Sequence, residues 1–165
     1  PALMTEGIVA SLLIVAAWLA IQARRRGLRF VLLLGLVFGI ATLIRPQSLL
    51  AAPLFGLVAT EGAWRRRLLA AAAPTALAAS VCLPWTFRNC ARMDRCVLVS
   101  ANAGWNLLIG ATPEAGGTFA PVADRIVPSQ CRTVFAEAEK DVCFGRAALD
   151  RIGSEPSASL AISLA

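Results

Sequence analysis

The pair Arg45-Pro46 constrains the fold of this chain more than any other feature. It interrupts an apolar stretch that runs from Phe30 to Thr60, and Arg45 is the only charged residue in that stretch. Proline lacks a backbone N–H and disfavours the α conformation of the residue before it. The sequence therefore predicts that one helix ends at this pair and that another begins there.

The segments on either side of this break are short. At about 1.5 Å per residue, Phe30–Ile44 would form a helix of about 22 Å and Ser48–Thr60 one of about 20 Å. The hydrocarbon core of a bilayer is about 30 Å thick, so we expect Arg45 slightly inside the outer interface, beside a cavity. A charge at such a place is a functional-site hypothesis by default. The alternatives are one long kinked helix with Arg45 reaching the interface, and a plain surface turn.

Composition places the chain among integral membrane proteins, because 58% of its 165 residues are hydrophobic and its mean hydropathy is +0.68. The net charge of +6 comes largely from arginine clusters at 24–29 and 65–67, each between apolar runs, as in cytoplasmic loops. No basic face interleaves with aromatic residues, so no nucleic-acid partner is expected. The absence of His and of any C-x-x-C spacing predicts no metal site.

We predict an all-α integral membrane protein with about four transmembrane helices in residues 1–85. The first covers Gly7–Ala23, the next two are the short helices broken at Arg45-Pro46, and the fourth covers Leu68–Trp85. Placing both arginine clusters inside puts the break and the start of the chain on the outer side. A single kinked helix would put the clusters on opposite sides, so this rule counts against it.

Residues 86–156 form the predicted outer region, which has loops and an amphipathic helix. Eight of the ten acidic residues of the chain lie between Asp94 and Glu155. The segments Ser100–Gly110 and Gly110–Pro128 contain the glycine and other small residues that are typical of loops.

The amphipathic helix is predicted for Glu137–Ile152, where apolar residues recur with a helical period. Pro156 is expected to end it, and residues 157–165 are expected to begin a further apolar span. The simplest interpretation of this helix is a surface helix that packs on the membrane region. The face expected to pack consists of Ala138, Val142, Leu149 and Ile152.

The cysteines suggest a disulfide-bonded outer region, which suits an oxidising compartment. Cys90 and Cys96 flank a short loop, and Cys131 could pair with Cys143. Four cysteines allow three pairings, and the sequence does not choose among them. Pairing Cys131 with Cys143 requires that the helix begin well after Cys131, because a continuous helix would hold the sulfurs about 18 Å apart. Cys82 lies within a span and is expected to be a small apolar residue.

Polar residues that the predicted topology brings to the outer face are the candidate site. Arg45 and Arg88 would suit an anionic group such as a lipid phosphate, because the guanidinium fork matches phosphate geometry. Glu6 lies at the mouth of the first span, and Trp85 and Asn89 lie at the exit of the fourth. The alternative for Arg88 is an anchor among bulk lipid headgroups.

Asn102 and Asn106 are candidates for binding a hydroxyl-rich ligand. Their amides can bond hydroxyl groups, and Trp105 between them can stack on a sugar face. The alternative is a turn-rich loop that folds onto the membrane surface.

Several stretches, in this order, resemble the membrane-embedded glycosyltransferases of the GT-C class that use polyprenyl-phosphate sugars. The similarity is to the family-39-type transferases and to the lipid A aminoarabinose transferase. Each stretch is weak alone, but the ordered set covers nearly the whole chain. The stretches are Pro1–Glu6, Gly35–Pro46, Pro84–Asn89, Asn102–Gly110 with Pro113, Glu114 and Gly117, and Glu137–Pro156.

The resemblance implies a transferase that moves a sugar from a polyprenyl-phosphate donor to a hydroxyl of a lipid, glycan or protein acceptor. It implies that Arg45 lies near the donor phosphate, that Glu6 lies near the active-site cavity, and that Arg88 and the Asn102–Gly110 loop lie over that cavity. Members of the family use an Asp of the first outer loop as the catalytic base. That loop would precede Pro1, so no catalytic residue is assigned, and this fragment is expected to be inactive.

No cofactor is predicted with certainty, and the need for a divalent metal stays open. The excess of Arg over the single Lys140 suggests a GC-rich bacterial genome. We therefore expect a multi-pass protein of the bacterial inner membrane with residues 86–156 in the periplasm. The competing interpretations are half of a transporter or flippase, in which broken helices also occur, a non-catalytic scaffold subunit, and a polymer ligase that uses the same lipid phosphate.

Overall fold

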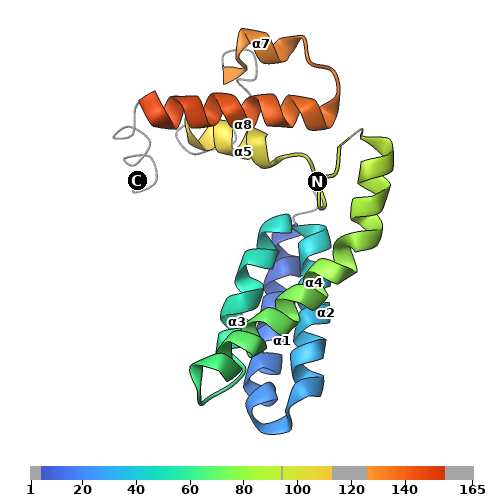
Figure 1. Cartoon of the computed structure of the whole chain (residues 1–165), viewed down its shortest axis with the longest axis vertical. Coiled ribbons are helices and arrows are strands. Elements are labelled where there is room, and N and C mark those ends of the chain that lie inside the picture. The colour runs from blue at the N-terminus through green and yellow to red at the C-terminus, as the bar shows by residue number, and fades with distance from the viewer. Residues whose placement is uncertain (1–4, 94, 113–125, 155–165) are drawn as a thin grey trace. The chain divides into compact units, whose positions relative to one another are not determined.

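The computed structural model describes residues 5–93, 95–112 and 126–154, and the regular structure in these ranges is helical (Figure 1). The chain divides into two compact units, a first unit of Pro1–Arg88 and a second unit of Asn89–Ala165. The expected end of the amphipathic helix at Pro156 and the expected span at 157–165 lie outside the described residues, as does most of the Gly110–Pro128 loop.

The first unit is a bundle of apolar helices. Two of them, α1 and α4, are long and apolar enough to cross a membrane, while α2 and the segment Pro46–Val58 are shorter apolar helices. The elements are α1 (Thr5–Arg26), α2 (Leu28–Ile44), the 3-10 helix η1 (Pro46–Ala51), α3 (Ala52–Val58) and α4 (Trp64–Arg92), whose last residues belong to the second unit.

The predicted break at Arg45-Pro46 is confirmed. α2 ends at Ile44, and Arg45 is extended, with φ −138° and ψ 107°. The segment after it is not the single α-helix over Ser48–Thr60 that the sequence predicts, since it begins as the 3-10 turn η1. Pro53, in the first turn of α3, has no N–H with which to extend an α-helical ladder backwards, which explains the change of helix type.

Both arginine clusters lie at the same end of the first unit. Arg24, near the end of α1, donates from Nε to the Val58 carbonyl at 2.6 Å and from Nη1 to Glu61 Oε1 at 2.8 Å. This places the α1–α2 connection beside the α3–α4 connection, and α2 lies alongside α3 (Figure 1). One long kinked helix through Arg45 is therefore contradicted, because it would separate these two connections.

Close approach between backbones holds α4 against α2 and α3. A Cβ atom added at Gly39 of α2 would lie 2.6 Å from Val81 Cβ, and one added at Gly56 of α3 would lie 2.3 Å from the Ala70 carbonyl oxygen. Small residues at helix contacts allow backbones to approach this closely. The glycines of the sequence stretch at 35–46 thus serve helix packing.

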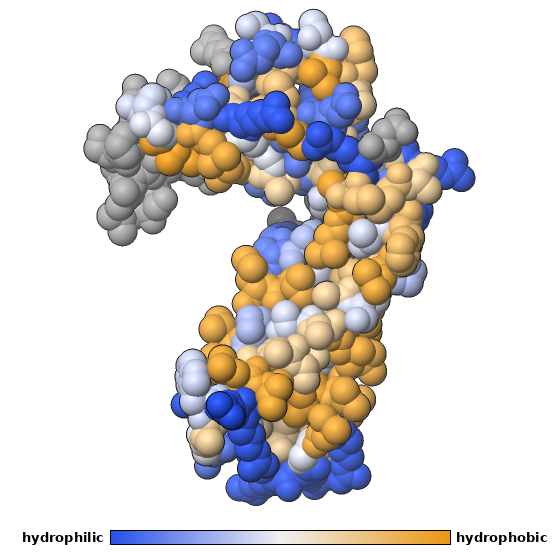
Figure 2. Space-filling view, in the orientation of Figure 1, coloured by the Kyte–Doolittle hydropathy of each residue, from blue (hydrophilic) through white to orange (hydrophobic). Residues whose placement is uncertain are grey.

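The surface of the first unit is apolar. Exposed large side chains include Ile14 at 72%, Leu50 at 77% and Leu69 at 70%. Figure 2 shows apolar residues over the visible face of the unit, with the largest group of strongly hydrophilic side chains at the end that carries the arginine clusters. Contiguous apolar surface of this kind marks contact with a membrane or another protein.

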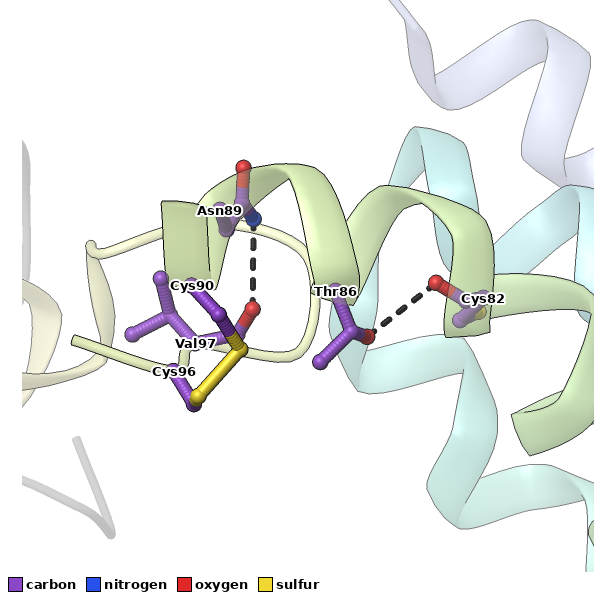
Figure 3. Close-up of a disulfide and its surroundings, with 6 residues drawn as sticks. All are labelled: Cys82, Thr86, Asn89, Cys90, Cys96 and Val97. Atoms are coloured by element: carbon purple, nitrogen blue, oxygen red, sulfur yellow. Dashed lines mark hydrogen bonds between the residues drawn. A yellow bond between two sulfur atoms is a disulfide. The ribbon is translucent and has the colours of Figure 1, made fainter. Parts of the chain in front are cut away.

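The helix α4 is longer than the predicted fourth span, Leu68–Trp85, because it continues to Arg92 through Pro74 and Pro84. A helix satisfies its own backbone groups, and in an apolar environment this favours continuation even where a proline removes one donor. Thr86, just after Pro84, donates its hydroxyl to the Cys82 carbonyl at 3.1 Å (Figure 3). Cys82 is fully buried, as expected of a small apolar residue in this helix.

The second unit contains α5 (Ala103–Gly110), α7 (Ser129–Arg132) and α8 (Glu137–Ser154) among its described residues. The loop predicted over Ser100–Gly110 is wrong for most of its length, because α5 covers it. Leu108 and Ile109 are buried in a core with Phe144 and Ala148 of α8. Contact between segments far apart in the sequence therefore overrides the loop-forming composition.

The amphipathic helix is confirmed, but its predicted face is partly wrong. Ala138, Phe144 and Ala148 are the buried residues of α8, whereas Leu149 is 61% exposed. The buried face is turned away from Leu149 because α5 packs where Gly104 meets the backbone of Asp141.

Two disulfides close the second unit, Cys90–Cys96 and Cys131–Cys143. These are the two pairs that the sequence suggested among three possible pairings. The condition for the second pair is met, because α7 ends at Arg132 and α8 begins only at Glu137.

Candidate functional site

The candidate site is a groove in the first unit beside the helix break at Arg45. The backbone there is fixed although it is not helical, since the Arg45 N–H donates to the Ala41 carbonyl at 2.8 Å and the Ser48 N–H donates to the Arg45 carbonyl at 2.9 Å. A cation that ends one helix and precedes another is thereby held at a defined place.

The Arg45 guanidinium contacts the first turn of α1. Its Nε donates to Thr5 Oγ1 at 3.0 Å, and its Nη2 forms an ion pair with Glu6 Oε1. The Arg45 side chain is 35% exposed and the Glu6 side chain 59%. Because a guanidinium carries more N–H groups than these two contacts use, Arg45 can bind an anion without leaving its position.

The groove has a polar rim and apolar walls and a volume of about 370 Å³. Arg45 and Glu6 stand at its polar part, together with Gln47 and the nearly buried Ser48. Such a groove suits an amphiphile with an anionic group and an apolar chain. The apolar part of the lining comes from Val9, Ala10, Leu13 and Ala51.

The structure thus brings together two of the residues that sequence analysis selected, Arg45 and Glu6. It adds Thr5, Gln47 and Ser48, which sequence analysis did not select. The sequence indicates these three residues only by their closeness to selected ones. Thr5 precedes Glu6, and Gln47 and Ser48 follow Arg45 within three residues.

Arg88 and Trp85, the next two candidates, contact each other on α4. The Arg88 guanidinium carbon lies 4.8 Å from the centre of the Trp85 ring, within the range of a cation–π contact. Neither residue is among the described residues that line the Arg45 groove. The role of Arg88 at a phosphate stays a prediction.

Asn89 has a structural position. It is fully buried, and its Nδ2 donates to the carbonyls of Val97 and Val99 at 3.2 and 3.0 Å. Figure 3 shows the bond to Val97 beside the Cys90–Cys96 disulfide, which closes the same loop. The Asn89 amide therefore organises this loop and does not line the groove.

Asn102 lines a smaller pocket of about 120 Å³ in the second unit, between α5 and the first turns of α8. Asn106, on the same helix, is exposed and is not among the described residues that line this pocket. The structure thus separates two asparagines that sequence analysis grouped.

A larger pocket of about 480 Å³ lies beside the Cys131–Cys143 disulfide, and sequence analysis did not predict it. It carries charges of both signs, from Arg95, Glu139, Arg146 and Asp150. The sequence indicates this pocket only through the spacing of Glu139, Arg146 and Asp150, which places all three on one face of α8.

In the described parts of the chain, no three or more Cys, Asp or Glu side chains come together as they would to hold a metal ion. Comparison with models of protein families found no match, and neither did comparison with curated proteins or with solved structures.

Proposed function

We propose that this chain belongs to a glycosyltransferase of the inner membrane of a bacterium, which moves a sugar from a polyprenyl phosphate to an acceptor hydroxyl on the periplasmic side. The observation that carries the proposal is the Arg45 groove, which joins a partly exposed guanidinium to an apolar wall. The ordered sequence resemblance to the GT-C class supports the same activity.

The proposal requires that the first unit lie in the membrane, with α2 and η1–α3 as a short broken pair between α1 and α4. Its exposed apolar surface and the location of both arginine clusters at one end support this orientation. Arg45 and Glu6 would then lie at the opposite, periplasmic end, and the second unit would lie in the periplasm, where disulfides persist.

In this mechanism Arg45 binds the phosphate of the donor lipid. When the bond between sugar and phosphate breaks, negative charge grows on the phosphate, and a fixed cation stabilises that charge. Glu6 and Thr5 hold the guanidinium in place. A carboxylate base would activate the acceptor hydroxyl, and no residue of this chain is assigned that role.

The test is the binding of radiolabelled undecaprenyl phosphate to the chain, purified in an amine-oxide detergent that has neither a sugar nor a phosphate headgroup. We expect Arg45→Gln to weaken binding about 10- to 100-fold, because a hydrogen bond to a charged group contributes about 1.5–3 kcal/mol. Arg25→Gln is the matched control, since Arg25 is an exposed arginine of the cluster at the other end.

Equal loss in both variants would show that the lipid binds any basic surface, and it would contradict the assignment of Arg45. Unchanged binding by Arg45→Gln, with the helix content of the wild type by circular dichroism, would contradict it as well. In that case a transporter or a scaffold would become the better interpretation.

A further inference from the structure

The N-terminus of α5 is capped in an unusual way. Asn102 occupies the N-cap position, where an asparagine ordinarily accepts a hydrogen bond from the second or third N–H of the helix, but its side chain makes no capping bond. The third N–H, that of Trp105, donates instead to Asp141 Oδ1 of α8 at 2.9 Å. Asp141, from another helix, therefore accepts the hydrogen bond that an N-cap residue ordinarily accepts.

The packing of α5 on α8 holds Asp141 in the position from which it accepts the Trp105 N–H. A Cβ atom added at Gly104 would lie 1.8 Å from the Asp141 carbonyl oxygen, so the two backbones are in direct contact. The Trp105 and Phe144 rings pack with their centres 5.1 Å apart. The elements around Asn102 are thus held rigidly, and its amide stays uncommitted.

The uncommitted amide lines the pocket of about 120 Å³ together with Trp105, Glu137, Lys140 and Asp141. An indole face stacks on the C–H face of a pyranose ring. The amide, the carboxylates and the ammonium group supply the donors and acceptors that ring hydroxyls need. Few ligand classes other than saccharides present both a flat C–H face and several hydroxyls.

We infer that this pocket binds one neutral saccharide ring, with Trp105 stacked on the ring and Asn102 bonded to its hydroxyls. Its charged side chains are two carboxylates and one ammonium group, so an anionic sugar binds less tightly than a neutral one. The inference rests on the second unit alone and does not depend on the phosphate assignment of Arg45.

The test is saturation-transfer NMR on the chain in the same sugar-free detergent, with the methyl glycosides of glucose, galactose and mannose as probes. We expect transfer to the ring protons of at least one probe, and at least threefold weaker transfer to methyl glucuronide. Asn102→Ala is expected to abolish the signal and to leave the thermal midpoint of unfolding unchanged, because Asn102 does not cap α5.

Asn106→Ala is the matched control, since it removes an exposed amide of the same helix outside the pocket. Trp105→Phe, which keeps an aromatic ring against Phe144, is expected to weaken the signal at least threefold. Transfer from none of the neutral probes would overturn the inference, as would equal loss in the Asn102 and Asn106 variants. A lower thermal midpoint in Asn102→Ala would assign that residue a structural role instead.

Discussion

The two units of this chain differ in the interactions that stabilise each of them internally. In the described part of the first unit, helices approach closely at small residues around a buried core that includes Leu34 and Phe38, and many other large apolar side chains are exposed. The described part of the second unit has a small core and is closed by two disulfides and by side chains bonded to backbone, as at Asn89 and Asp141.

The proposed location of the first unit in the membrane and of the second in the periplasm would account for this difference. A helix bundle in lipid gains little from hydrophobic burial, so close packing decides its stability. A small unit in water has too little core to be stable by burial alone and commonly uses disulfides. The two kinds of cohesion therefore support a lipid environment for the first unit and an aqueous, oxidising one for the second.

The largest effect is expected from Gly56→Ala in the first unit. The added Cβ would lie 2.3 Å from the Ala70 carbonyl oxygen, and neither backbone can move without separating α3 from α4. We expect a destabilisation of about 3 kcal/mol, the upper range of overpacking, measured by unfolding in mixed detergent and denaturant. Gly7→Ala is the control, since nothing lies within 4 Å of its added Cβ; equal stability of the two variants would contradict the packing described.

Removal of the Cys131–Cys143 disulfide is expected to destabilise the second unit alone. A closed loop of this length, with a sequence separation of 12, contributes about 2–3 kcal/mol. The double variant Cys131→Ser, Cys143→Ser should be cleaved faster by trypsin at Arg132 and Arg146, with no change at Arg65–Arg67. Faster cleavage at both places would show that the units do not differ in the way described.

A smaller effect is expected from Arg24→Ala. Arg24 bonds the Val58 carbonyl and Glu61, but the side chains of this ion pair are 42% and 75% exposed, so screening by solvent limits its contribution. We expect a loss of about 0.5–1 kcal/mol, measured as for Gly56. Arg25→Ala serves as the control, and a loss above about 2 kcal/mol for Arg24→Ala would mean that the pair is more buried than described.

The smallest effect is expected from Glu6→Gln on the binding of undecaprenyl phosphate. Glutamine at this position can keep a hydrogen bond that holds the Arg45 guanidinium, but it removes a negative charge that repels the lipid phosphate, and an exposed charge interaction contributes up to about 1 kcal/mol. Affinity should therefore rise, by about fivefold at most. A marked loss of affinity would mean that the charge of Glu6 is needed to orient Arg45 and that this effect exceeds its repulsion of the phosphate.

Local chemistry explains what the sequence could predict. The break at Arg45 followed from Pro46 alone, and α8 followed from its own periodicity. The helix α5 could not be predicted in this way, because its stability depends on Leu108 and Ile109 packing against Phe144 and Ala148, more than thirty residues further along the chain. The exposure of Leu149 has the same cause, since the position of α5 decides which face of α8 is buried.

The same distinction applies to the candidate site residues, because some of their positions could be predicted from the sequence and others depend on distant contacts. The proximity of Arg45 and Glu6 depended on the topology, which the arginine clusters indicate, and the structure brings the two residues together. The availability of Asn102 depended on Asp141 accepting the Trp105 N–H, a contact that no local pattern encodes. Asn89 looked like a site residue because polar residues at a helix end often are, but its contacts are with the backbone of a disulfide loop.

The most direct test of the central claim is transfer of radiolabelled sugar from polyprenyl phosphate by the full-length protein in detergent. We predict release of sugar to an acceptor or to water by the wild type, and its loss in Arg45→Ala with folding intact. Transfer by Arg45→Ala at the rate of the wild type would contradict the role of Arg45 at the phosphate. Absence of transfer from every donor by the folded wild type would contradict the proposed activity itself.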